Sequence, residues 1–197
     1  MTVPFATSNI IAMAFGHLEL SPPSSFADTT PQANEAVLNY PVALDLCLEW
    51  TDWSFASSLV LLAEIALPTG IATDPKLPYA FALPGDCIMF REVADDTVRY
   101  RLDEGILRAD SAAPLTVRYT RRITDESRTS ATFRQAVALQ LAVLLAPRWL
   151  GVDTKRQTLV SMLDAMRRQS SKTDARTASP EAYSQSDTAD WVTEALR

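Results

Sequence analysis

The chain has 197 residues, enough for one ordinary domain or for a domain with an appendage, and a chain of this length folds without a disulfide or metal staple. Apolar residues make up 47% and charged residues 21% of it, which excludes a fibrous repeat and disorder throughout. The formal net charge of −6 gives no general attraction to nucleic acid or to an anionic membrane, so any basic surface must be local.

Two further features bear on the cellular compartment. Cys47 and Cys87 lie in apolar segments, which favours buried free thiols, although a disulfide between them stays open. Residues 1–5 lack the basic start of a signal peptide, and the apolar run at 141–146 is far shorter than the roughly 20 residues of a membrane helix. We therefore expect synthesis in the cytoplasm and no membrane partner.

Two helices are predicted near the N-terminus. The first covers residues 7–16, with Thr7 or Ser8 as the cap and Gly16 at the end. The second covers residues 31–50, after the cap and first-turn proline at Thr30 and Pro31. Its apolar stripe is Ala33, Ala36, Val37, Tyr40, Leu44, Cys47 and Leu48. Pro41 lies within this stripe and predicts a kink or a break into two helices, and we favour the kink.

Residues from about 57 to 123 predict β-structure. The stretch 59–67 is compatible with a strand or a helix, whereas Pro and Gly residues at 68, 70 and 75 mark a loop. The later strands are expected at 79–84, 87–93, 98–102, 106–107 and 115–123. Asp103, Glu104 and Gly105 form a hairpin turn between two of them. We expect these strands to form one antiparallel meander.

The last of these strands alternates apolar and polar residues, so one of its faces is polar. If the strands pair in sequence order, that face gathers the four arginines Arg99, Arg101, Arg118 and Arg122. A solvated sheet face is the first interpretation of this basic patch. An acidic protein partner and the phosphates of DNA are the other two, and the sequence does not order them.

Two more helices and a C-terminal arm complete the chain. Ser130 caps an apolar helix at 130–147 that should form the centre of the core, and a helix at 153–169 carries one apolar stripe, with Leu159, Met162 and Met166, on a basic surface. Residues 170–197 hold almost nothing large enough to bury and predict an extended arm. The arm ends in apolar residues that suit a partner: Trp191, Val192, Ala195 and Leu196. Alternatively, Trp191 folds back on its own domain.

Residue patterns typical of catalysis are missing. His17 is the only histidine, so a Ser-His-Asp triad or a two-histidine metal site cannot form within one chain. The five glycines never cluster as in a phosphate-binding loop. The carboxylate pairs at 95–96 and 103–104 fall at expected turns. We expect no enzyme activity, no cofactor and no metal.

Several segments, in order, resemble the tail tubular protein A family. These segments are Ser8–Gly16, Tyr40-Pro41 with Asp45, Trp53–Ala56, Tyr79–Cys87, Gly105–Leu107, Pro114–Asp125 and the helix of Phe133. The family comprises the adaptor rings that join the portal to the tail in short-tailed phages, with relatives in gene transfer particles. The predicted elements indicate an α+β fold in one domain at residues 1–169, followed by a flexible arm at 170–197. The resemblance implies that this adaptor domain is a helical bundle with an antiparallel β-sheet extension.

The resemblance also implies an assembly. A homo-dodecameric ring would sit in the virion or phage-like particle beneath the portal protein and above a tail or stopper protein, with double-stranded DNA passing through its channel without sequence-specific binding. Within that assembly, we expect the arm to bind the portal through Tyr183, Trp191, Val192 and Leu196. One alternative is a DNA-binding packaging accessory protein that uses the arginine face. Another is an enzyme with an unrecognised carboxylate site.

Overall fold

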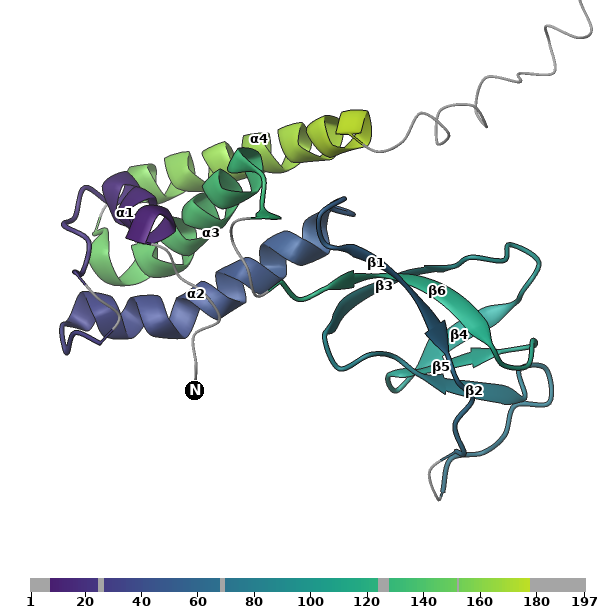
Figure 1. Ribbon diagram of the computed structural model, residues 1–197. Helices are drawn as coiled ribbons and strands as arrows, with labels where there is room; N and C mark the ends of the chain where they lie inside the picture. Colours follow the sequence, from purple (N-terminus) through teal and green to yellow (C-terminus); the bar gives the residue numbers. More distant parts are fainter. Residues whose placement is uncertain (1–7, 25–26, 68–69, 124–127, 152, 178–197) are drawn as a thin grey trace, which may run out of the picture.

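Four helices pack together in the computed structural model, which describes residues 8–24, 27–67, 70–123, 128–151 and 153–177 (Figure 1). They are α1 (Ser8–His17), α2 (Pro31–Trp50), α3 (Ala131–Trp149) and α4 (Asp153–Thr177). The central helix is α3, which contacts each of the other three. Most of its circumference is buried between Phe133 and Ala146, as expected for a core helix.

Capping residues fix where α2 and α3 begin. The Thr30 Oγ1 atom accepts a hydrogen bond from the Ala33 N–H at 3.2 Å, and Ser130 Oγ accepts one from the Phe133 N–H at 3.1 Å. Both side chains satisfy a backbone donor that has no partner within the helix. These two helix starts are where the sequence predicts them.

The far ends of α3 and α4 lie beyond their predicted positions. The helix expected to end at 147 continues through Pro147 to Trp149. The helix expected to end at 169 continues to Thr177, so residues 170–177 are helical and do not belong to an extended arm. No glycine or proline occurs between Gly151 and Pro180, so nothing in the backbone stops α4 at 169. Of its expected apolar stripe, Leu159 is buried, but Met162 is 42% exposed.

Pro41 lies inside α2 without dividing it, because one continuous helix runs from Pro31 to Trp50. Figure 1 shows α2 changing direction near its middle. A proline ring removes one backbone N–H and crowds the preceding turn, which bends a helix at that point. The result is the kink that the sequence favours.

Residues 57–121 form two small antiparallel sheets. Their strands are β1 (Ser57–Leu62), β2 (Tyr79–Ala82), β3 (Cys87–Val93), β4 (Tyr100–Asp103), β5 (Ile106–Ala109) and β6 (Leu115–Arg121). The first sheet has the order β1-β6-β3 and the second has the order β2-β5-β4. The prediction of β-structure is confirmed. The stretch 59–67, which was compatible with a strand or a helix, begins within strand β1. The prediction of one meander in sequence order is wrong.

Cross-strand packing explains why β3 does not pair with β4. β3 lies beside β6, where Val93 is opposite Val117 and Phe90 is opposite Tyr119. β4 pairs instead with β5, through a two-residue turn. Both turn residues, Glu104 and Gly105, have positive φ values, of 51° and 79°, as in a type I′ hairpin. Both strands of this hairpin belong to the second sheet.

The molecule has two apolar cores. The larger lies within the helices, and it extends to Trp53, Ala56 and Ile123 at the edge of the sheets. The smaller lies between the two sheets, around Phe81, Leu107 and Val117. We call the helical part the bundle and residues 57–121 the β unit.

The β unit is inserted between α2 and α3 and extends from the end of α2 (Figure 1). The chain enters it at β1 and leaves it after β6, and these two strands pair with each other, with Ser57 opposite Thr120. The Arg121 N–H also donates to the Ala56 carbonyl at 2.9 Å. Entry and exit therefore lie side by side.

Candidate functional site

The junction between the bundle and the β unit brings together segments that are distant in sequence. Its centre is Trp53, which is 1% exposed and donates its indole N–H to the Cys47 carbonyl at 2.8 Å. The Trp53 ring meets Phe133 edge-on, with ring centroids 5.1 Å apart, and Phe55 lies 5.0 Å from Phe133. Three aromatic rings thus join the end of α2 to the start of α3.

Arg91 of β3 fastens the β unit to the last turn of α2. Its guanidinium donates to the carbonyls of Leu48, at 3.3 Å, and Thr51, at 2.9 Å. It also donates to Thr120 Oγ1 of β6 at 2.7 Å. The last turn of α2 contains no basic residue, so Arg91 supplies the positive charge that favours the carbonyl end of a helix.

Two of the four predicted arginines lie at this junction, each in ion pairs. Arg118 Nε donates to Glu92 at 2.8 Å. Its Nη1 atom contacts Asp52, which follows Thr51 just beyond the end of α2. The hydrogen bond to Glu92 raises the pKa of Arg118. Arg122 makes a two-pronged contact with Asp45 of α2, at 3.1 and 2.6 Å.

Of the other two arginines, Arg101 lies in β4 of the second sheet and Arg99 directly precedes that strand. Arg99 Nε is 2.8 Å from Asp110, whereas Arg101 pairs with both Asp103, at 2.7 Å, and Asp74, at 3.1 Å. The predicted single face of four arginines is therefore wrong, because β4 and β6 belong to different sheets. Each of the four is also ion-paired, which weakens the attraction of this surface to phosphate.

Tyr119 and Asp86 complete the junction. The Tyr119 hydroxyl donates to Asp86 Oδ1 at 3.1 Å, and the Asp86 carbonyl accepts from the Arg122 N–H at 2.7 Å. Burial raises the pKa of Tyr119, so its hydroxyl stays protonated as a donor. This contact ties the loop before β3 to the end of β6.

The predicted portal contacts cannot be placed. Tyr183, Trp191, Val192 and Leu196 lie outside the described residues, as does the rest of the arm beyond Thr177.

The two cysteines are free thiols, and Cys47 is buried while Cys87 is half-buried. Burial raises the pKa of the Cys47 thiol well above its usual value, which makes this group unreactive.

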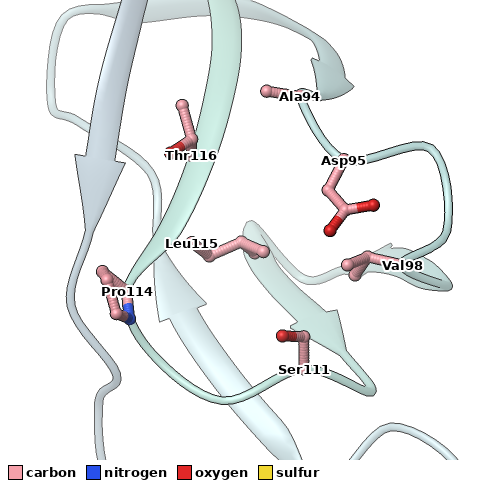
Figure 2. Close-up of a pocket in the computed structure, with 7 residues that line it drawn as sticks. All are labelled: Ala94, Asp95, Val98, Ser111, Pro114, Leu115 and Thr116. Carbon is pink, nitrogen blue, oxygen red and sulfur yellow. The ribbon is translucent and has the colours of Figure 1, made fainter.

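A shallow cavity of about 280 Å³ lies between the β3–β4 turn and the start of β6 (Figure 2). Asp95 is the one ionisable side chain among the seven drawn there. Its carboxylate accepts hydrogen bonds from the hydroxyl and the N–H of Thr97, at 2.6 and 2.9 Å, and these lower its pKa. Asp95 therefore stabilises the turn between β3 and β4, as expected.

A second cavity, of about 520 Å³, lies at the β4–β5 hairpin. One of its lining residues is Arg108 of β5, which is only 4% exposed. Sequence reasoning missed this residue. The signal was an arginine in a strand that otherwise contains Ile106, Leu107 and Ala109.

Neither a metal-binding cluster nor a membrane-spanning helix occurs in the described ranges. No group of three or more His, Cys, Asp or Glu side chains in them could hold a metal ion. None of the helices described combines the length and the apolar character that crossing a membrane requires.

Comparison of the sequence with protein-family models gives no match, and comparison with curated proteins gives none either.

Proposed function

We propose that this chain is a structural subunit of a head-to-tail adaptor, which forms a ring between the portal and the tail of a phage or phage-like particle. One observation carries the proposal: four of the segments that resemble the tail tubular protein A family, and the helix of Phe133, meet at the junction. Asp45 pairs with Arg122, and Tyr119 binds Asp86. Trp53 packs on Phe133. These residues hold the β unit on the bundle, which is the two-part shape that the resemblance implies.

A ring needs subunits that present different surfaces at a fixed angle, because only then does the repeated contact close. The aromatic cluster and the Arg91 contacts supply that rigidity. Exposed apolar side chains occur on both parts: Leu38 and Val42 on α2 are 68% and 49% exposed, and Leu59 and Leu61 on β1 are 64% and 63% exposed. Such side chains suit lateral contacts between neighbouring subunits.

Imaging of the purified protein by negative-stain electron microscopy, alone and with the portal of the same particle, tests the proposal. We expect rings with the portal's axial symmetry, twelvefold in the implied dodecamer. The variant Arg122→Met removes the ion pair with Asp45 at the junction. The variant Arg99→Met, which removes a distant ion pair with Asp110, is its control. A protein that stays monomeric and does not bind the portal would contradict the proposal.

The ring would let DNA pass without gripping it. The chain carries a net charge of −6, and the four predicted arginines are ion-paired. An acidic or neutral channel repels or ignores phosphate, whereas a basic one holds it through release of counterions. Retention of duplex DNA by the purified protein at physiological salt, with a steep salt dependence, would favour the DNA-binding accessory protein instead.

The arm remains part of the proposal. Each copy would bind the portal weakly through Tyr183, Trp191, Val192 and Leu196, and repetition around the ring would make the sum strong. Removal of residues 180–197 should abolish portal binding and leave the fold intact. A pull-down with the portal measures the first effect, and circular dichroism measures the second. Unchanged portal binding would refute the role of the arm.

A further inference from the structure

β1 is an edge strand, and two of its leucines turn their backbone groups away from the sheet. The described sheet places β6 on one side of β1 and no strand on the other. The Arg121 N–H donates to the Ala56 carbonyl, so every second residue from Ala56 to Leu62 bonds to β6. The residues between them direct their N–H and C=O groups to the free edge, and Leu59 and Leu61 are two of these.

The side chains of the same two leucines are exposed. Val60 and Leu62 belong to the core between the sheets, which leaves Leu59 and Leu61 on the outer face of the first sheet. Leu59 is 64% exposed and Leu61 is 63% exposed. A single exposed leucine is ordinary in a folded protein. Here two neighbouring leucines on one face present both apolar side chains and backbone hydrogen-bonding groups to the outside.

The other edge strands carry features that hinder pairing with another chain, and β1 does not. β3 has two register shifts and contains Arg91 and Glu92, whereas β4 contains Arg101 and Asp103. β2 has only four residues and borders the segment at 64–65. Bulges, charges and short length are the usual protections of a sheet edge. β1 has six residues without charge or proline, and its pairing with β6 has no register shift.

The sequence of β1 is complementary to a second copy of itself. In an antiparallel pair centred on Val60, Leu59 of each copy lies opposite Leu61 of the other. Both leucines direct their backbone groups to the edge, so each of the two pairs forms two hydrogen bonds. Four leucine side chains then meet on one face of the joined sheet. No charge in either strand opposes the pairing.

The C-terminal residues of the chain itself fit this edge less well. Residues 178–197 contain four acidic residues and one arginine. An added strand covers Leu59 and Leu61 only if apolar residues alternate along it. As a strand, the apolar end of the chain would place Glu194 on one face between Val192 and Leu196. A second copy of β1 supplies the alternation without a charge.

We propose that two copies of the free protein pair through β1, antiparallel and centred on Val60. The pairing joins two three-stranded sheets into one sheet of six strands, with the order β3-β6-β1-β1-β6-β3. In the proposed ring, the same leucines would contact a neighbouring subunit, so the pair is a form of the free protein that ring assembly would replace. The inference concerns the free protein and does not depend on the adaptor function.

Sedimentation and amide hydrogen exchange of the full chain test the pairing. We expect a species of twice the chain mass of 21.7 kDa, which dissociates on dilution. In that dimer, the amides of Leu59 and Leu61 should exchange at least about tenfold more slowly than the amide of Leu102. Leu102 is the internal reference, because its N–H faces the free edge of β4. Dilution should remove the protection of Leu59 and Leu61.

Lysine variants at the edge provide the second test. Leu61→Lys adds a charge to each of the paired strands and should give a monomer in which the Leu59 amide exchanges as quickly as that of Leu102. Leu59→Lys should act in the same way. Both side chains are mostly exposed, so we expect both variants to fold. Met162→Lys, at a side chain of α4 that is 42% exposed, is the matched control and should leave the dimer intact.

Four results would overturn the proposal. The first is a monomer at every concentration, with rapid exchange at Leu59 and Leu61. The second is a dimer that survives both lysine variants at the edge. The third is protection in a monomer that disappears on removal of residues 178–197, which would assign the edge to the chain's own C-terminal segment. The fourth is a series of larger aggregates in place of a dimer.

Discussion

The bundle and the β unit are stabilised in different ways. The bundle buries a continuous apolar core around α3, with Leu139, Leu141 and Leu145 each at most 1% exposed. The β unit has a smaller core and relies more on ion pairs, including Arg99 with Asp110 and the pairs of Arg101. Exposed ion pairs contribute little, typically below about 1 kcal/mol each, whereas a buried leucine contributes several times more.

This difference suggests a division of roles. The bundle supplies most of the free energy of folding, and the β unit offers charged and apolar surface on a scaffold held by the junction. If so, substitutions in the bundle should act on the whole protein, and substitutions in the β unit should act locally.

Leu141→Ala should have the largest effect. Its side chain is completely buried in α3, so truncation removes apolar contacts and leaves a cavity, at an expected loss of about 3 to 4 kcal/mol in the free energy of unfolding. Urea denaturation followed by circular dichroism measures the loss. Leu38→Ala, at a side chain that is 68% exposed, is the matched control and should change stability by less than about 0.5 kcal/mol. Equal losses would contradict the central place of α3.

Arg91→Met tests the junction. It removes the donor to the Leu48 and Thr51 carbonyls, at an expected cost of about 2 kcal/mol. Hydrogen exchange should quicken at the last turn of α2 and in β3, and stay unchanged at the centre of α3. The same substitution at Arg99, an exposed side chain bonded to Asp110, should leave the exchange of α2 unaltered. Faster exchange throughout the bundle would show that the two parts do not separate in this way.

Glycine-to-alanine substitutions should change the stability of the protein in opposite directions in the bundle and in the β unit. Gly105→Ala places a side chain at φ +79° in the β4–β5 turn, which should cost about 1 kcal/mol. Gly16→Ala lies within α1 with no atom within 4 Å of the added Cβ, and should stabilise the protein by up to about 1 kcal/mol. Thermal denaturation compares the two variants. A stabilising Gly105→Ala would contradict the type I′ turn.

Acid should loosen the β unit by a smaller amount. Hydrogen bonds lower the pKa of Asp95 and Asp110, from Thr97 and Arg99 respectively, and the Lys76 N–H lowers that of Asp74. A lowered pKa in the folded state contributes stability above the unfolded value of 3.8, and this contribution disappears as the pH falls through the folded value. Side-chain resonances of the β unit should therefore broaden below about pH 4. Asp110→Asn should reduce this pH dependence, and an unchanged dependence would assign it to other groups.

Local signals allowed much of the bundle to be predicted from the sequence. Thr30 and Ser130 mark helix starts because a single side chain caps each one. Pro41 marks the bend in α2 because the loss of one N–H acts within a turn. The Asp103–Gly105 turn could likewise be predicted, since it depends on backbone conformations that few residues adopt.

Strand order and the site depend on contacts distant in sequence. No local sequence feature of β3 indicates that its partner is β6, which lies more than twenty residues further along the chain. The wrong pairing therefore led to the prediction of four arginines on one face. Arg91 caps a helix about forty residues before it, and Arg108 lines a cavity together with Ile71 and Ala72 from the segment before β2. Side-chain type alone does not reveal such partners.

The adjacent entry and exit of the β unit imply that it could be exchanged. Ser57 and Thr120 are paired neighbours, and Ala56 accepts from the Arg121 N–H at 2.9 Å, so a short glycine-rich connector could replace the whole segment between them. Such a graft would close a loop of few residues, and short loops carry a small entropic penalty. The β unit could thus be replaced by another segment, in evolution or by engineering, without changes to the bundle.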